Sequence, residues 1–115
     1  MKAEELRIGN LLQNKEGNFT IKATPNIIEE LWVHGITKYS PVEFTVDLAV
    51  EFGFKKIRNS INEECYRRTE NNCEYYDIFV DRNKFHLYKA DCFITTFEYV
   101  HTLQNTYFFI SDVEL

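Results

Sequence analysis

The C-terminal segment, residues 99–110, constrains the fold more than any other part of the chain. Its apolar residues Val100, Leu103 and Tyr107 recur at the spacing of one face of an α-helix, and Tyr99 and Ile110 flank that face. We therefore expect a C-terminal helix whose apolar face closes the core of the protein.

The opposite face of this helix is polar and carries one aromatic ring. It presents His101, Gln104, Asn105 and Phe108, again at helical spacing. In one interpretation the amides hydrogen-bond neighbouring loops and sheet ends, because buried amides need partners. In the other, the face contacts a partner or a ligand. The sequence leaves both interpretations open.

The length of 115 residues and the hydrophobic content of 44% predict one domain, residues 1–115, with an ordinary core. No apolar run approaches the ~18–20 residues of a membrane span. The charged N-terminus lacks the apolar centre of a signal peptide. We therefore expect a cytoplasmic protein without a membrane partner.

The three cysteines, Cys65, Cys73 and Cys92, are odd in number and form no C-x-x-C pair. Such cysteines are typical of reduced thiols. A structural zinc site needs four converging ligands, usually in close pairs. We expect no metal and no cofactor.

The N-terminal half alternates strand and helix patterns. Residues 6–12 and 19–23 predict a hairpin, with Gly9 as a possible bulge in its first strand. A short helix over residues 27–33 follows, with Thr24 or Asn26 as its N-cap.

After an extended stretch at residues 36–40, Thr45 caps a second helix over residues 46–52, which Gly53 ends. Between residues 55 and 97 the apolar period becomes two. The strands are expected at residues 65–68, 75–80, 85–89 and 92–97.

These elements predict an α+β fold. Its antiparallel sheet comprises the N-terminal hairpin and a meander of three or four strands. Two or three short helices accompany the sheet, and the C-terminal helix packs on it.

Catalytic motifs are absent from the sequence. A nucleophilic pair, Cys92 with His101 or Cys65 with His86, would need hydrogen-bond reach and a third orienting group. No sequence pattern provides either, and we expect a protein that is not an enzyme.

The net charge of −5 argues against direct binding of nucleic acid, which requires a basic patch. The basic residues concentrate only at positions 55–58 and 67–68, near acids. An acidic surface suits a partner with a positive groove, or it keeps the protein soluble.

The predicted sheet is rich in aromatic residues whose neighbours are carboxylates rather than basic side chains. This combination suits a protein partner better than RNA, because tyrosines anchor protein interfaces. A phenylalanine-rich core explains most of the aromatic residues but not all seven tyrosines. The residues that we expect to bind are Tyr75, Tyr76, Asp77 and Tyr88 on the sheet, with His101, Gln104, Asn105 and Phe108 on the helix.

Three stretches carry a resemblance to a known family: residues 5–11, residues 40–45 continuing to 52–54, and residues 99–108. The last stretch follows the pattern Y-V-H-x-L-Q-N-x-Y-F before a short acidic tail. The chain resembles a family of small proteins encoded by phages and mobile elements of Bacteroidetes-type bacteria. The resemblance carries no catalytic role, and it implies a genetic setting of phage or mobile element.

In such a setting, small acidic proteins commonly act by binding. We expect a protein that inhibits or modulates a host protein, most concretely an anti-CRISPR-type inhibitor of a nucleic-acid-guided defence effector. The alternative is a phage structural or accessory protein that self-associates through a sheet edge or the C-terminal helix.

Overall fold

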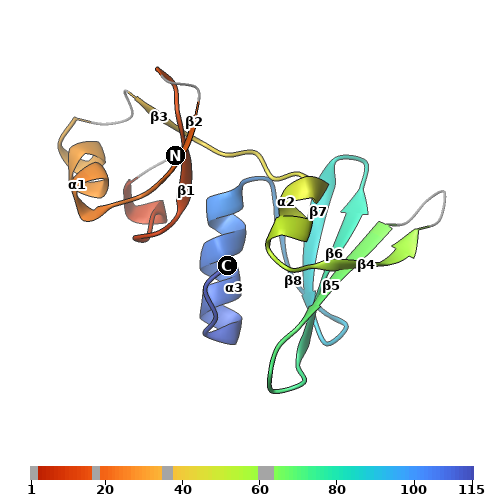
Figure 1. The fold of residues 1–115 in the computed structure, drawn as a ribbon. Coiled ribbons are helices and arrows are strands. Elements are labelled where there is room, and N and C mark those ends of the chain that lie inside the picture. The colour runs from red at the N-terminus through yellow and green to blue at the C-terminus, as the bar shows by residue number, and fades with distance from the viewer. Residues whose placement is uncertain (1–2, 17–18, 35–37, 60–63) are drawn as a thin grey trace. The chain divides into compact units, whose positions relative to one another are not determined.

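The computed structural model describes residues 3–16, 19–34, 38–59 and 64–115 (Figure 1). In chain order the elements are η1 (Ala3–Glu5), β1 (Leu11–Asn14), β2 (Phe19–Lys22), α1 (Pro25–His34), β3 (Tyr39–Pro41), α2 (Val46–Glu51), β4 (Lys55–Asn59), β5 (Glu64–Thr69), β6 (Tyr75–Asp81), β7 (Lys84–Lys89), β8 (Cys92–Phe97) and α3 (Val100–Ser111). The strands form two antiparallel sheets, which confirms the α+β class.

The first sheet has the strand order β2-β1-β3, and it contains the predicted N-terminal hairpin. Helix α1 begins two residues earlier than predicted, at Pro25. Thr24, one of the two predicted caps, accepts a hydrogen bond at Oγ1 from the backbone N–H of Ile27 at 3.3 Å. The apolar side of α1 packs into a core with η1 and the sheet. That core contains Ala3, Leu6, Leu12, Ala23, Ile27, Leu31 and Tyr39.

Residues 6–10 form a turn, so the prediction of a strand that begins at residue 6 is wrong. The side chain of Asn10 accepts a hydrogen bond from the backbone N–H of Arg7 at 2.6 Å, and the backbone N–H of Asn10 donates to the Arg7 carbonyl. Gly9 has a φ of +94°, which L-amino acids rarely adopt. These local hydrogen bonds form a turn in place of a regular strand. The backbone N–H of Gly9 and the carbonyl of Asn10 still pair with Ala23, directly after β2.

The second sheet is a five-stranded meander in the order β4-β5-β6-β7-β8. Two-residue loops connect β6 to β7 and β7 to β8. Arg82 and Asn83 have φ angles of 48° and 69°, and Ala90 and Asp91 have 47° and 68°. Positive φ at both loop residues is the turn geometry that matches the twist of a hairpin. Both loops fall within the gaps between the predicted strands, although neither contains glycine.

Strand β4 was not among the predicted strands, so the meander is one strand longer than the upper estimate. Its sequence, Lys-Lys-Ile-Arg-Asn, has one apolar residue and therefore no apolar alternation. It pairs with β5 only, at the edge of the sheet. Charged side chains are common on edge strands, where they oppose pairing with another chain.

Helix α2 covers one face of the five-stranded sheet. Thr45 caps it as predicted, accepting from the backbone N–H of Leu48 at 3.3 Å, and Gly53 ends it with a φ of +89°. Arg68 of β5 reaches the end of α2, where Nη1 donates to the Phe52 carbonyl at 2.6 Å. The sheet residues buried on this face are Tyr66, Tyr76, Ile78, Leu87 and Phe97.

Helix α3 buries the predicted apolar stripe, since Val100, Leu103 and Tyr107 are all 0% exposed. It lies beside β1, where the backbone N–H of Leu11 donates to Gln104 Oε1 at 2.9 Å.

Contacts along the chain divide it into two compact units. One comprises Met1–Glu43 with Tyr99–Leu115, and the other comprises Phe44–Glu98. Whether the two units fold as one domain stays a prediction. In the described part of the chain, no helix has both the length and the apolar character that crossing a membrane requires.

Candidate functional site

The five-stranded sheet carries a group of aromatic rings on the face opposite to α2. Strand alternation places Tyr75, Asp77 and Phe79 of β6 on this face, because Tyr76 and Ile78 point to the buried face. The same alternation adds side chains of β7 and β8. We call Tyr75, Phe79, His86, Tyr88 and Phe93 the aromatic surface.

The register of the hairpins brings these rings together. Tyr88 lies opposite Asp77 on one side and Phe93 on the other, while Phe79 lies opposite His86. The Tyr88 ring meets Phe79 at a centroid distance of 5.0 Å and Phe93 at 5.5 Å, both edge to face. The His86 ring lies 6.3 Å from Phe93. Phe79, His86, Tyr88 and Phe93 therefore form one continuous cluster across three strands, and Tyr75 lies on the same face.

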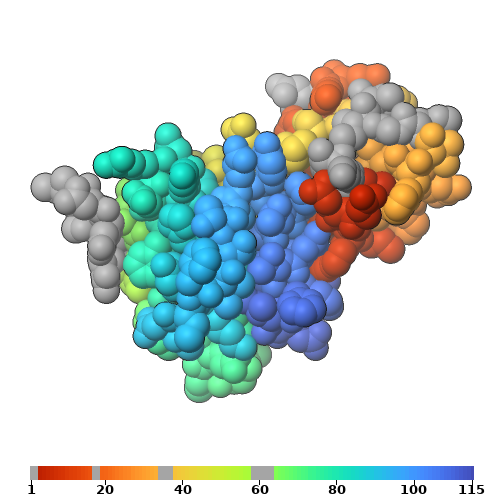
Figure 2. Space-filling model, turned by 180° about the vertical axis from the view of Figure 1, so that it is seen from behind, coloured from red at the N-terminus to blue at the C-terminus, as the bar shows by residue number. Residues whose placement is uncertain are grey.

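The aromatic surface is open to solvent. Phe93 is 56% exposed, and the other four rings are partly exposed. In the space-filling view of Figure 2, side chains of the β7–β8 region, in light blue, lie at the surface. Among the described residues of Phe44–Glu98, α2 is the only helix, and it lies on the other face. Exposed aromatic rings in contact with one another are typical of interaction sites.

A partly buried ion pair supports one side of the aromatic surface. Arg67 Nε and Nη2 donate to the two carboxylate oxygens of Asp77 at 2.7 and 2.9 Å. The guanidinium group lies 4.1 Å from the centroid of the Tyr75 ring. The hydrogen bond to Asp77 raises the pKa of Arg67 above its usual value. Arg67 thus stays charged and lies over the Tyr75 ring.

The hydroxyl group of Tyr75 has a further partner. Its hydroxyl donates to Asp91 Oδ2 at 3.0 Å, and this hydrogen bond raises the pKa of the phenol. Asp91 belongs to the β7–β8 loop. The Tyr75 side chain therefore has Arg67 over its ring and Asp91 at its hydroxyl, which reduces the entropy that it would lose on binding.

Charged and polar residues border the aromatic surface at the end of the β6–β7 hairpin. A shallow pocket of about 480 Å³ is lined there by Arg82, Asn83, Lys84, Thr96, Phe97 and Glu98. Thr96 also joins this region to the aromatic surface, because its hydroxyl lies 2.8 Å from His86 Nδ1. An aromatic centre with a polar border is the usual composition of a protein–protein interface.

Two of the four sheet residues that we expected to bind a partner are almost completely buried. Tyr76 is 0% exposed and its hydroxyl donates to Glu74, while burial raises its pKa to about 12. Asp77 is 2% exposed beneath Arg67. The structure brings the other two, Tyr75 and Tyr88, into the aromatic surface, together with three rings that were not among the expected binding residues.

The amides of α3 make hydrogen bonds within the protein. Gln104 Oε1 accepts from the backbone N–H of Leu11 at 2.9 Å and from Asn10 Nδ2 at 3.4 Å. Asn105 Oδ1 accepts from Asn10 Nδ2 at 2.8 Å, and Asn105 Nδ2 donates to the Glu5 carbonyl at 2.7 Å. This arrangement is the one expected if the amides fix a neighbouring loop and a strand end.

Phe108 and His101 complete the polar face of α3. The Phe108 ring has the guanidinium of Arg7 4.2 Å from its centroid, and Arg7 also pairs with Glu114 at 2.8 Å. His101 is 3% exposed and stacks on Tyr99 at 5.9 Å. Among the described residues, His101 Nδ1 has no hydrogen-bond partner. Burial lowers the pKa of His101, and the charge of Glu5 partly opposes this.

We expect the stability of the protein to fall as the pH drops below about 6.5, the usual pKa of histidine. The pKa of His101 is lowered in the folded protein, so the unfolded chain binds more protons in this range and acid favours it. Urea denaturation at pH 7.5 and 5.0 measures the effect. His101→Phe should lose less stability between these pH values than the wild type. Equal losses in both proteins would contradict the assignment to His101.

The sheet does not bring together Cys65 and His86, one of the two nucleophilic pairs considered from the sequence. Cys65 and His86 lie on β5 and β7 with Phe79 of β6 between them, so two strand spacings, or about 10 Å, separate them. Cys65 is also 1% exposed. Among the described residues, no group of three His, Cys, Asp or Glu side chains is placed to hold a metal ion.

Comparisons with known protein families, with curated proteins and with solved structures found no match for this chain.

Proposed function

We propose that this protein acts by binding a partner protein through the aromatic surface. The observation that supports the proposal is the contact between Phe79, Tyr88 and Phe93 on a sheet face that remains open to solvent. Tyrosine and other aromatic residues are enriched among the residues that contribute most to binding energy. The fixed position of Tyr75 between Arg67 and Asp91 favours the same role.

The net charge of −5 and the two hydrogen bonds that join Arg67 to Asp77 argue against phosphate as the main ligand of this surface. A guanidinium group that already has two bonds to a carboxylate is less available to a phosphate. Nucleic-acid binding also needs several unpaired cations. We therefore propose a protein partner and no direct contact with nucleic acid.

A narrower form of the proposal concerns the partner. The resemblance to phage and mobile-element proteins suggests a host protein, most concretely a nucleic-acid-guided defence effector that this protein inhibits. This form rests on the resemblance and on the acidic charge, which favours a partner with a basic groove.

Paired pull-downs test the proposal. The baits are the wild type, a surface variant with Phe93→Thr and Tyr88→Thr, and a control variant, Phe109→Gln. Phe109 is 89% exposed on α3, so the control also removes an exposed phenylalanine. The lysate comes from a bacterium that carries a guided defence effector, and circular dichroism verifies that each bait is folded.

We expect one host protein to be retained by the wild type and by Phe109→Gln, and to be lost from the surface variant. Purified effector should then lose its nuclease activity in the presence of the wild type only if the narrower form is correct. Equal retention by all three baits would contradict a role for the aromatic surface. Recovery of the bait alone would favour self-association instead.

A further inference from the structure

Helix α1 exposes two large apolar side chains that its own packing does not use. Ile27 and Leu31 are buried in the core of the first unit, at 8% and 5% exposure. On the outward side, Trp32 is 63% exposed and Val33 is 67% exposed. Tryptophan is mostly buried in folded proteins, so this exposure favours a role in contact with another molecule.

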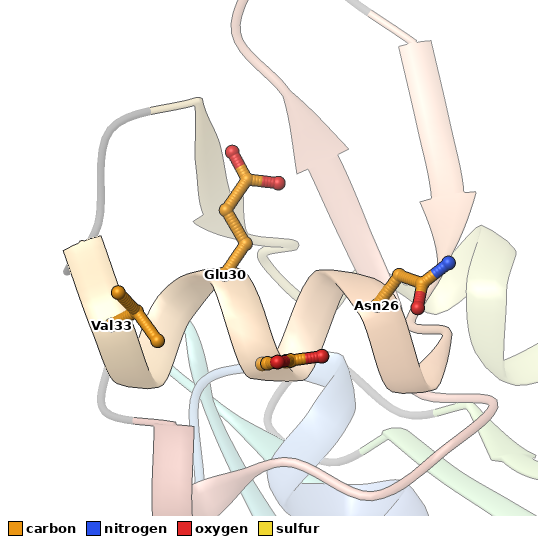
Figure 3. Close-up of a pocket in the computed structure, with 4 residues that line it drawn as sticks. Asn26, Glu30 and Val33 are labelled. Atoms are coloured by element: carbon orange, nitrogen blue, oxygen red, sulfur yellow. The ribbon is translucent and has the colours of Figure 1, made fainter.

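Two carboxylates lie on the exposed part of the helix: Glu29 is beside Trp32, and Glu30 is about 160° around the helix from Trp32, beyond Val33. A shallow depression of about 390 Å³ is lined by Asn26, Glu29, Glu30 and Val33. Figure 3 shows Asn26, Glu30 and Val33 spaced along this side of α1. Glu29 precedes Trp32 by three residues, a spacing that makes the two side chains neighbours on a helix. We call Asn26, Glu29, Glu30, Trp32 and Val33 the α1 outer face.

The charge of the α1 outer face is only partly balanced. Lys38 Nζ lies 4.0 Å from Glu30, which is the outer limit of an ion pair, and both side chains are well exposed. Among the described residues, Glu29 and Trp32 have no hydrogen-bond, ion-pair or ring partner. Glu29 therefore places an unbalanced negative charge beside the exposed indole of Trp32, and Glu30 adds a partly balanced charge at the other border of the face.

The chemistry of these groups selects a cationic partner. The indole ring is the best aromatic partner for an ammonium or guanidinium group. Carboxylates form charge-assisted hydrogen bonds with the same groups, and arginine forms two at once. Phosphates and acidic peptides would instead be repelled. We infer that the α1 outer face binds an arginine- or lysine-rich segment of a partner protein.

This inference goes beyond the proposed function, because it concerns a surface of the other compact unit. Substitutions in the α1 outer face leave the residues of the aromatic surface unchanged, and those in the aromatic surface leave α1 unchanged. The two proposals therefore succeed or fail in separate experiments.

Trp32 provides the readout, because it is the only tryptophan in the chain. The probe is a hexa-arginine peptide, titrated at low salt while the fluorescence of Trp32 is followed. Hexaglutamate is the control peptide. The variant Glu29→Gln with Glu30→Gln removes the carboxylates, and Glu16→Gln with Glu51→Gln makes the same change in net charge at exposed positions elsewhere.

We expect hexa-arginine to change the Trp32 fluorescence saturably and hexaglutamate to leave it unchanged. Loss of both α1 carboxylates should weaken binding by roughly fivefold or more, while the charge-matched control should weaken it less than twofold. In calorimetry, Trp32→Leu should weaken binding by roughly two- to fivefold. Binding should also weaken at about 0.5 M salt, where exposed charges are screened.

Three results would overturn the inference. The first is no fluorescence change with hexa-arginine. The second is an equal loss of affinity in the two charge variants, which would indicate non-specific attraction to the whole protein. The third is a fluorescence change that depends on protein concentration without peptide, which would assign the α1 outer face to a second copy of the chain.

Discussion

Replacing Gln104 with alanine is expected to lower the free energy of unfolding by about 2–3 kcal/mol. The side chain of Gln104 is 3% exposed, and its Oε1 accepts hydrogen bonds from the backbone N–H of Leu11 and from Asn10 Nδ2. Alanine would leave the buried N–H of Leu11 without this acceptor and would open a cavity. Urea denaturation monitored by circular dichroism measures the change.

The control for this experiment is Thr106→Ala on the same helix. Thr106 is partly exposed, and we expect its replacement to change stability by no more than about 0.5 kcal/mol. If Gln104→Ala were as stable as Thr106→Ala and lost binding to a partner instead, the polar face of α3 would be a contact surface. The hydrogen bonds to Asn10 and Leu11 would then contribute little to folding.

Replacing Asp77 with alanine is expected to cost about 2 kcal/mol. Removal of one partner from a fully buried pair commonly costs about 3–5 kcal/mol, because the remaining charge has lost its partner. The effect should be smaller here because the Arg67 side chain is 36% exposed and water can reach it. The measurement is again the free energy of unfolding in urea, at neutral pH.

A double variant tests whether the contributions of Arg67 and Asp77 to stability depend on each other. Arg67→Leu with Asp77→Leu removes both charges and restores apolar volume, so we expect it to cost less than Asp77→Ala alone. The double variant is compared with Arg67→Leu and Asp77→Leu. If its loss of unfolding free energy equals the sum of the two single losses, the two side chains act independently. In that case the pair would not be what positions Arg67 against Tyr75.

Local sequence signals were sufficient to predict most of the elements. Thr45 and Gly53 bound α2 as expected, and Thr24 caps α1, because capping depends on residues within one turn. The two-residue loops of the meander were also located correctly. The turn at residues 6–10 was missed because it depends on a side-chain hydrogen bond of Asn10, which an apolar pattern does not reveal.

The candidate site was predicted less well, because it depends on which face of a strand each residue occupies. Tyr75 and Tyr76 are neighbours in sequence but point to opposite faces of β6. The alternation of β6 and the two-residue loops together determine that Phe79, Tyr88 and Phe93 meet. These signals are present in the sequence, and reading them jointly would have placed Phe79 and Phe93 in the site.

The polar face of α3 could not be interpreted from its own residues. The partners of Gln104 and Asn105 are Asn10, Leu11 and Glu5, which lie some ninety to one hundred positions earlier in the chain. A helical pattern shows that two amides share a face, but it does not reveal what lies against that face. Contacts of such long sequence separation come from the tertiary structure.

The most direct test of the central claim is the affinity of the retained partner, once purified, for three forms of this protein. Calorimetry should give a dissociation constant at least about tenfold higher for Phe93→Thr than for the wild type, because we expect Phe93 to be a hot spot of the interface. Phe109→Gln should bind within about twofold of the wild type. Unchanged affinity in Phe93→Thr, or an equal loss in Phe109→Gln, would contradict binding through the aromatic surface.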